Sequence, residues 1–529
     1  MAVLERFAPP ARFSHLRSAP ECPVCGELRR SYLFVVRGLP VARCPSCGLV
    51  SLSPQPSPDD LASFYRDSEL IADPRIRWSD SLTERDAAEQ YGRALRERGV
   101  KAGRILLVAP PFHSFAETEN VVVERQVTVR DLESGVTLEK NAFDAAIVLY
   151  QLEQAMDPAR VLAQVFAALR ADGILLLAAP SLDSWPARFF GDSWTEWRPE
   201  NLFYFDRSIL QRMLLKTGFA DVSIDADRRR YTLRHIHDRA EAFPRTNVTR
   251  LARLLYPLLP APLRDVRVRL ATSGMVVTAR KGSQRTRPLV SIVMPVYNER
   301  ETFQTLMEAV LAKEIAGADK EIIVVESNSR DGTRDAVLEY RDHPRVRIIL
   351  EDRPRGKGHA VRTGLSEARG DIVLIQDADL EYDINDYDAL VEPLLSHRAA
   401  FVLGARHGGS WKMRKFADEQ GLSTALNLGH VFFTTLLNVL YRQRMSDPFT
   451  MFKVFYRDCL HGLHLECDRF DFDHELVIKL VRKGYRPLEI PVNYRSRSFK
   501  EGKKVRMFRD PITWLWVDLK YRFGSATGQ

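Results

Sequence analysis

The sequence has few cysteines, no long apolar segment and no strong excess of charge. Six cysteines in 529 residues are too few for a disulfide framework. The longest uncharged run, 422–441, includes seven polar residues, so it does not predict a membrane span. The net charge of +8 is only a weak indication of an anionic partner, and no nucleic-acid binding is expected.

The composition excludes a disordered chain, because 45% of the residues are apolar and 28% are charged. Near the N-terminus, Glu5, Arg6 and Pro9 lie where a signal peptide would have its apolar segment. We therefore expect a cytoplasmic protein. Peripheral contact with the inner face of the cytoplasmic membrane stays open.

Four of the cysteines form two pairs with metal-ligand spacing. Cys22 and Cys25 are followed by a glycine, and Cys44 and Cys47 repeat that pattern. Each pair can supply two thiolates from one tight turn, and two such turns make a closed tetrahedral site. The alternative is two redox or disulfide pairs. The doubled spacing favours structural Zn²⁺ in a small zinc ribbon.

Two α/β segments follow the ribbon and predict three domains. A proline-rich stretch at 53–58 and a polar, basic stretch at 281–288 serve as linkers. Alternation of apolar strands and helices predicts parallel sheets in both segments. We predict a ribbon with its linker at 1–58 and α/β domains at 59–284 and 285–529. The expected strands are 105–108, 145–149, 174–179, 290–294, 321–325, 346–350 and 372–375.

In the first α/β segment, four motifs carry a likeness to a known family, at residues 141–149, 169–177, 194–205 and 215–219. On these residues the segment resembles a class I methyltransferase of the type that carries an N-terminal zinc ribbon. The resemblance implies a Rossmann-like domain that binds S-adenosylmethionine through glycines after its first strand. Here that strand runs into Ala109-Pro110-Pro111, and prolines remove backbone donors. We therefore expect a domain without this cofactor.

In the second α/β segment, polar turns follow two predicted buried strands. Tyr297 and Glu299 follow the first of them, and Asp377 and Asp379 follow the other. Because ligands bind beyond the carboxyl ends of parallel strands, both turns should face one crevice. Two carboxylates at a turn suit a hard divalent cation that bridges a pyrophosphate, although such acids can also be simply solvated.

Two further loops point to a phosphate or nucleotide ligand. Lys357 lies between Gly356 and Gly358 ahead of a predicted helix, where backbone N–H groups can contact phosphate. Glu326 follows the strand at 321–325 and offers an acceptor for a base or ribose.

Together these motifs resemble glycosyltransferase family 2 with a GT-A fold, and most closely its dolichol-phosphate mannosyltransferases and bacterial polyprenyl-phosphate relatives. The residues that carry the resemblance are 377–383, 404–406, 447–455 and 494–504. It implies Mg²⁺ or Mn²⁺ on Asp377 and Asp379, with Glu381 as a third ligand. The nucleotide-sugar set comprises Pro295, Tyr297, Glu299, Glu326, Lys357, Asp377, Ala378, Asp379 and Arg406.

Two features concern the acceptor. Seven basic residues between Arg495 and Arg509 form either a solvated strip or a clamp on an acceptor phosphate, with Arg495 and Lys503 as its main contacts. A helix expected at 423–442 carries a polar stripe on a broad apolar face, and it is either a core helix or a membrane-interface helix.

The sequence thus predicts a metal-dependent inverting hexosyltransferase of envelope or glycan biosynthesis that acts on a polyprenyl phosphate. The first alternative is transfer to a sugar hydroxyl, with Asp473 or Glu475 as general base. The second is a sugar methyltransferase with an accessory glycosyltransferase-like domain. The expected catalytic set is Asp377, Asp379, Asp473, Glu475, Arg495 and Lys503.

Overall fold

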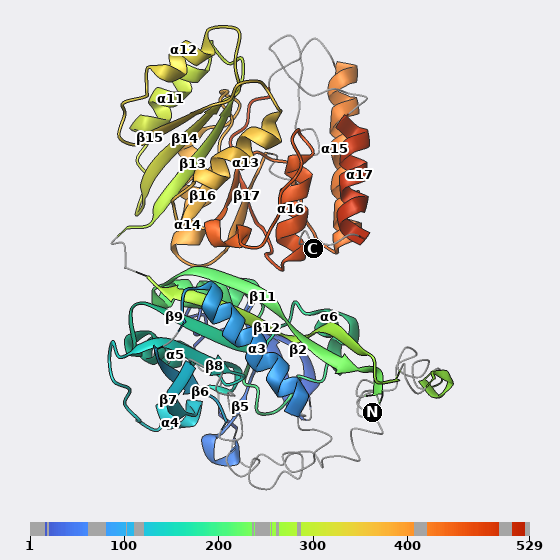
Figure 1. The fold of residues 1–529 in the computed structure, drawn as a ribbon. Coiled ribbons are helices and arrows are strands. Elements are labelled where there is room, and N and C mark those ends of the chain that lie inside the picture. Colours follow the sequence, from blue (N-terminus) through green and yellow to red (C-terminus); the bar gives the residue numbers. More distant parts are fainter. Residues whose placement is uncertain are drawn as a thin grey trace. The chain divides into compact units, whose positions relative to one another are not determined.

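The computed structural model divides the chain into two compact units, residues 1–284 (unit 1) and 285–529 (unit 2). Each unit is described by itself (Figure 1). The structure describes residues 16–17, 21–36, 38–61, 81–101, 103–110, 121–234, 237, 254, 256–260, 264–282, 287–406, 420–496 and 510–523. No helix in these ranges is long and apolar enough to cross a membrane.

Unit 1 is built on a six-stranded sheet with the order β11-β12-β9-β8-β6-β7. β6, β7, β8 and β9 run parallel, whereas β12 is antiparallel to both of its neighbours. This is the Rossmann-like, methyltransferase-type arrangement that the sequence predicted. The strands are β6 (Gly103–Val108), β7 (Val121–Val127), β8 (Phe143–Leu149), β9 (Leu169–Pro180), β11 (Phe219–Thr232) and β12 (Arg267–Lys281).

Helices cover the two faces of this sheet unequally. On one face, α3 buries Tyr91 and Leu95 against a cluster that includes Ile105 and Leu149. The other face carries a larger cluster. The helices of unit 1 are α3 (Ser81–Glu97), α4 (Val129–Glu133), α5 (Pro158–Ala168), α6 (Trp185–Phe190) and α7 (Arg207–Thr217).

The cysteine-bearing segment shares the larger core of unit 1. Its strands form a four-stranded sheet of order β10-β4-β3-β2, in which Phe203 and Tyr204 of β10 pair with β4. Cys22, Cys44 and Leu52 belong to the same apolar cluster as the sheet strands. The strands are β2 (Ser31–Val36), β3 (Leu39–Arg43), β4 (Val50–Leu52) and β10 (Phe203–Tyr204), and β1 (Leu16–Arg17) pairs with β5 (Gln55–Pro56).

Unit 2 is a seven-stranded mixed sheet of order β15-β14-β13-β16-β18-β17-β19. β13 is central and runs parallel to β14 and β16, so their carboxyl ends share one edge. β18 is antiparallel to β16 and brings its first residues to that same edge. The strands are β13 (Leu289–Val296), β14 (Asp319–Glu326), β15 (Val346–Leu350), β16 (Ile372–Ile375), β17 (Phe401–Ala405), β18 (Lys453–Tyr456) and β19 (Leu488–Pro491).

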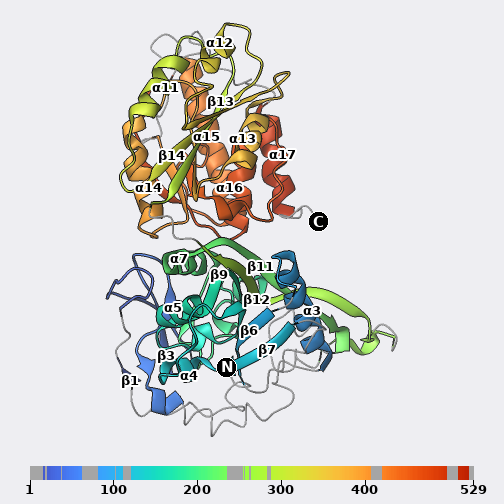
Figure 2. The same cartoon turned by 60° about the vertical axis from the view of Figure 1, so that its left-hand side comes forward.

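Among the helices of unit 2, α13 packs on β13 and β14, and α15, α16 and α17 pack on one another (Figures 1 and 2). Gly364 of α13 allows the close approach, because a Cβ there would lie 2.4 Å from Val293. The helices are α11 (Phe303–Ala312), α12 (Thr333–Leu338), α13 (Lys357–Glu367), α14 (Tyr387–Leu395), α15 (Gln420–Tyr441), α16 (Phe472–Arg482) and α17 (Asp510–Phe523).

Candidate functional site

In unit 2, the crevice begins where β13 and β16 separate. Their pairing ends at Val293 and Ile375, and Gln376 makes the last backbone bond between them. Pro295 lies just beyond this point and has no N–H to donate, so β13 can turn away without leaving an unpaired donor. Tyr297 and Glu299 follow on one side of the opening, and Asp377 follows on the other.

Asp377 is held by a lysine that the strand order brings from another element. The ammonium nitrogen of Lys357, at the start of α13, lies 2.8 Å from each carboxylate oxygen of Asp377. Burial disfavours the charge on Lys357, but Asp377, Asp473 and Asp379 outweigh that effect and raise the pKa of the ammonium. Asp377, Asp379 and Asp473 are therefore all within electrostatic reach of one cation.

The glycines beside Lys357 have a packing role that the sequence could not reveal. A Cβ on Gly356 would lie 2.3 Å from the carbonyl oxygen of Asp468. A Cβ on Gly358 would lie 2.6 Å from the Cβ of Phe472. Only glycine lets the start of α13 approach the start of α16 this closely. This contact places Lys357 within electrostatic reach of Asp473.

Asp473 is paired with a second lysine, which is fully buried. The Nζ of Lys453 is 2.7 Å from an oxygen of Asp473, and the Lys453 side chain has 0% exposure. Lys453 also donates to the carbonyl of Thr450. Burial lowers the pKa of Lys453 despite the attraction of Asp473.

The sequence patterns predicted no role for Lys453. A lysine inside the apolar run Met451-Phe452-Lys453-Val454-Phe455 was the available signal. A lysine that is fully buried in such a strand needs a partner of opposite charge.

Arg406 and Asp447 form a third buried pair. The guanidinium donates two bonds of 2.8 Å to the carboxylate, in a bidentate arrangement. Burial would raise the pKa of Asp447, but Arg406 holds it well below the usual range. Arg406 also lies over the ring of Tyr494, 5.3 Å from its centroid. In this arrangement the Arg406 side chain organises the wall of the crevice.

The Glu381 side chain bonds to Tyr494, and its backbone N–H donates to the Asp379 carboxylate, 3.1 Å away. The Glu381 carboxylate accepts a 3.0 Å bond from the Tyr494 hydroxyl, and the Glu381 backbone carbonyl accepts from Arg495. Within the described residues, the four cysteines alone form a group of three or more metal-type ligands. A ligand role for Glu381 stays a prediction. Lys503 lies outside the described residues, and Arg495 is exposed beside the loop.

Glu475 and Glu326 are fully buried and occupied by other groups. Glu475 accepts bonds from two backbone amides, from Lys479 and from the Tyr521 hydroxyl. Glu326 accepts from the Ser329 amide and from Arg334. These contacts stabilise α16 and the loop after β14. The catalytic role of Glu475 and the nucleotide-binding role of Glu326 stay predictions.

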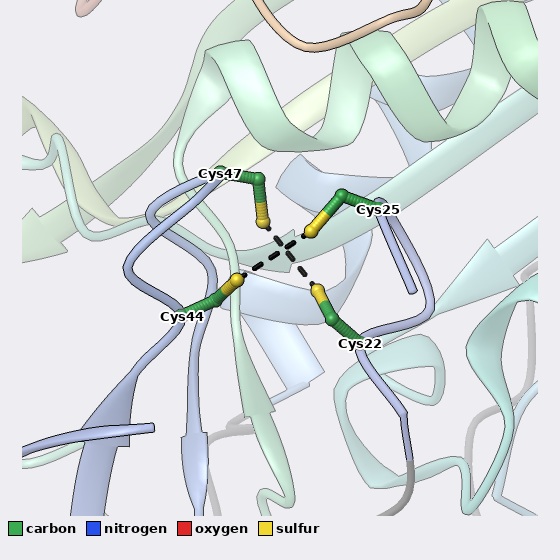
Figure 3. Close-up of side chains that lie close together, drawn as sticks. All are labelled: Cys22, Cys25, Cys44 and Cys47. Atoms are coloured by element: carbon green, nitrogen blue, oxygen red, sulfur yellow. Dashed lines mark hydrogen bonds between the residues drawn. The ribbon is translucent and has the colours of Figure 1, made fainter. Parts of the chain in front are cut away.

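In unit 1, the four cysteines form one cluster, as predicted. Figure 3 shows their sulfur atoms directed toward one another, and all four lie within 4.8 Å. Cys22 and Cys47 are 3.4 Å apart, and Cys25 and Cys44 are 3.5 Å apart. A tetrahedral Zn–S₄ site with bonds of about 2.3 Å needs sulfur separations near these values. The donor set therefore fits zinc.

The two turns that present the cysteines are near copies. Gly26 donates to the carbonyl of Cys22, and Gly48 donates to that of Cys44, both with positive φ. Cations from α7 add support, because Arg212 donates to the Cys47 carbonyl and Lys216 to the Val24 carbonyl. These contacts tie the cluster to the methyltransferase-type core.

The carboxyl edge of the unit 1 sheet differs from that of unit 2. Ala109 after β6 is fully buried, and its N–H donates to Val127 of β7. Tyr150 after β8 has a positive φ of 50° and donates to Asp227, 2.6 Å away. Glu153 is buried, and one of its oxygens has no bonding partner. Residues 111–120 lie outside the described part, so the loop containing Pro111 is not placed.

A comparison with protein families matches part of unit 2. Residues 291–461 match the family model described as "Glycosyl transferase family 2". Unit 2 therefore contains a family 2 glycosyltransferase domain, and the chain is a glycosyltransferase.

Two relatives share about a quarter of their residues with this chain. A dolichyl-phosphate beta-glucosyltransferase of Trichomonas vaginalis is 26% identical over 250 residues, which are 45% of this chain and 73% of that protein. A dolichol-phosphate mannosyltransferase of Pyrococcus furiosus is 26% identical over 216 residues, 40% of this chain and 58% of that protein.

Among solved structures, glucosyl-3-phosphoglycerate synthase from Mycobacterium tuberculosis, in complex with Mn²⁺, UDP-glucose and phosphoglyceric acid, aligns with a TM-score of 0.33. The identity is 19%, and the alignment covers 45% of this chain and 81% of that one.

Proposed function

We propose that unit 2 transfers a hexose from a nucleotide-sugar to a polyprenyl phosphate, in a metal-dependent reaction that inverts the anomeric carbon. Two relatives from distant organisms are named for transfer to dolichyl phosphate, which supports this acceptor class. The paired acids and lysines at the carboxyl edge of the sheet support a charged, phosphate-bearing donor.

The observation that carries the proposal is the exposed apolar side of α15. Its polar residues Asn427, His430 and Thr434 are buried. Phe433 and Leu437 are buried with them, but Phe432 and Val439 face outward and are 57% and 71% exposed. A core helix has the opposite arrangement, whereas a helix that lies on a membrane needs an outward apolar face.

α17 extends this outward apolar surface. It packs beside α15, and the Tyr441 hydroxyl donates to the Asp518 carbonyl between the two helices (Figure 2). Ile512 and Trp516 of α17 are 71% and 66% exposed. We name this surface the apolar helix face. Peripheral contact of that face with a bilayer would bring the crevice to a lipid-linked phosphate. The apolar helix face comprises Leu428, Val431, Phe432, Val439, Ile512, Leu515, Trp516 and Leu519.

The residues present fit a divalent cation. Asp377 and Asp379 offer carboxylate oxygens from one turn, which are the ligands that Mg²⁺ and Mn²⁺ prefer. Bound there, the cation would neutralise charge on the departing nucleoside diphosphate. Lys357 already neutralises Asp377 and would lie beside the same pyrophosphate, where it adds a fixed positive charge.

Whether Asp473 is needed as a general base depends on the acceptor. A phosphate monoester is largely dianionic near pH 7 and attacks without a base. A sugar hydroxyl needs one, and Asp473 is the predicted acid that lies near the crevice. Its pairing with Lys453 suits an electrostatic role that orients Lys357, which agrees with a phosphate acceptor.

The test is a panel of UDP-, GDP- and TDP-sugars with a polyprenyl phosphate and with a glycan acceptor. We expect transfer to the polyprenyl phosphate, with less than about tenfold loss in Asp473→Asn, because no base is required. Asp388→Asn is the matched control, since Asp388 also pairs with a lysine but lies away from the crevice. Transfer to the glycan alone, with a loss of about 100-fold or more in Asp473→Asn, would overturn the acceptor assignment.

A further inference from the structure

Unit 1 carries a two-stranded β-ribbon beyond its main sheet. β12 pairs with β9 only from Gly274 to Arg280, whereas its pairing with β11 continues outward. The extension consists of residues 228–232 of β11 and 267–271 of β12 (Figure 2). A two-stranded ribbon is only marginally stable by itself, so packing on a third strand does not explain which residues lie on its surface.

One face of this ribbon is unusually basic. Arg230 stands directly opposite Arg269, and Arg228 and Arg267 are on the same face because residues two apart share a side of a strand. All four are exposed. Like charges directly opposite each other destabilise a strand pair, so the register of Arg230 and Arg269 costs stability. We name the exposed surface of Arg228, Arg267 and Arg269 the arginine face.

Among the described residues, no acid forms an ion pair with Arg228, Arg267 or Arg269. Asp265, near the end of the ribbon, pairs with Arg234. Asp225 accepts a bond from the Ser223 hydroxyl. On the opposite face Arg229 shows the usual pattern, because it is 11% exposed and pairs with the buried Asp227.

Aromatic side chains lie near the ribbon. α6 packs against β12, and its Trp185 and Phe189 are 64% and 48% exposed. Their rings stack on each other at 5.4 Å, and Phe190 meets both edge-on. Exposed tryptophan with nearby arginine is typical of residues at a membrane–water boundary.

We propose that the arginine face, with Trp185 and Phe189, binds the anionic headgroups of a lipid bilayer. This surface is separate from the apolar helix face and does not rest on the proposed transferase activity. A nucleic acid is the other polyanion that such a face could bind. It is disfavoured because Trp185 and Phe189 stack on each other, whereas a base-binding platform presents a free ring face.

The test compares the full chain with the variant Arg228→Gln/Arg267→Gln/Arg269→Gln. Sedimentation with vesicles would be measured for phosphatidylglycerol mixed with phosphatidylcholine and for phosphatidylcholine alone. We expect the variant to bind the anionic vesicles about 100-fold more weakly, as three basic residues at a charged surface would give. Binding to neutral vesicles, which the apolar helix face would support, should not change.

The matched control is Arg125→Gln/Arg341→Gln/Arg369→Gln, which removes the same charge from exposed arginines elsewhere. It should bind anionic vesicles within about threefold of the original chain. Transfer to a soluble short-chain acceptor should be equal in all three proteins, so a failure of the transferase proposal is seen separately.

Three results would overturn the inference: equal binding of the original chain to both vesicle types, an undiminished affinity in the arginine-face variant, or binding of short duplex DNA in place of vesicles. Misfolding of the variant would be detected by its melting temperature. We expect that temperature to equal or exceed that of the original chain, because opposed charges are removed.

Discussion

The two parallel sheet edges of this protein hold their acids in opposite ways. In unit 2, Asp377 and Asp473 are each paired with a lysine, of which Lys453 is fully buried and Lys357 is half-buried. In unit 1, the corresponding edge buries Glu153 with one unbonded oxygen and with Glu196 nearby. Both sheets therefore have a carboxyl edge of the kind that binds ligands. The partners of the acids differ, and lysines stabilise the charged form of the acids at the edge of unit 2.

The two candidate metal sites, the cysteine cluster of unit 1 and the aspartate pair of unit 2, also differ. The cysteine cluster of unit 1 is closed and joined to the core, which is typical of structural zinc. The aspartate pair of unit 2 follows the carboxyl end of β16, with Asp379 buried, and we propose that it holds a cation that takes part in chemistry. Each of the two sites can be tested by a substitution of one of its residues.

The largest effect is expected from Cys25→Ser. We predict about one zinc per chain in the original protein and loss of that zinc in the variant, because a four-thiolate site cannot stay closed with three ligands. Structural zinc contributes on the order of 10 kcal/mol of binding free energy, so unit 1 should unfold at a much lower temperature. Metal analysis and calorimetry would measure this, with Cys467→Ser as control. Full zinc occupancy in Cys25→Ser would refute the assignment.

The next largest effect concerns Asp379. Asp379→Ala should reduce sugar transfer by at least about 1,000-fold, or about 4 kcal/mol in the activation free energy. Its melting temperature should stay close to that of the original chain, because the change is at a loop. Asp388→Ala serves as the control. Undiminished transfer by Asp379→Ala, in chelator without added metal, would falsify the metal mechanism.

Glu475→Gln should affect stability more than turnover. The change removes the nearer anionic partner of buried Lys479 and leaves Glu466 at 4.0 Å, which costs up to about 3–5 kcal/mol in the free energy of unfolding. Urea unfolding of unit 2 would measure this cost, and the folded variant should keep most of its activity. A variant that is stable but loses activity about 100-fold would instead make Glu475 the general base.

A pH effect is expected in unit 1. Burial raises the pKa of the Glu153 carboxyl to about 8, and Glu196 adds to the rise. Folding therefore binds a proton between the ordinary carboxyl pKa and about 8, so this group's stabilising contribution is lost as pH rises through that window. Glu153→Gln should gain a few kcal/mol relative to the original chain above pH 8, at about 1.4 kcal/mol per pKa unit. The two proteins should unfold alike near pH 5, and an equal gap at both pH values would contradict the assignment.

The smallest expected effect is from S-adenosylmethionine. We predict no heat of binding and no change in the melting temperature of unit 1, because Ala109 and Pro110 stand where glycines would be needed. Titration calorimetry would measure this. A dissociation constant in the low micromolar range, about −8 kcal/mol, would restore the sugar methyltransferase alternative and remove the contrast between the two edges.

Local patterns were enough to predict several elements closely. The strands expected at 346–350 and 372–375 have those bounds in the structure, because each is a short apolar run between polar turns. The helix expected at 423–442 is α15, at Gln420–Tyr441. The cysteine cluster followed from spacing alone, since a tight turn determines both its backbone and its ligands.

The direction of side chains was harder to predict. The polar stripe of α15 was visible in the sequence, but whether it faced inward depended on neighbours such as Met445 and Ser446, which accept or donate bonds to it. Likewise, Asp473 and Glu475 are two residues apart and looked equivalent. On α16, two residues correspond to about 200° of rotation, so one reaches Lys453 and the other reaches Tyr521.

The sequence by itself determined the four-cysteine site, the α/β architecture of both units and the strand end that carries Asp377 and Asp379, because these depend on local spacing and hydrophobic period. Only the tertiary structure decided which lysine meets which acid, and which face of α15 is exposed. Lys357, Lys453 and Asp473 come from three elements whose approach depends on strand order and on two glycines that permit close packing. Such contacts are fixed by packing between distant segments, which no local pattern encodes.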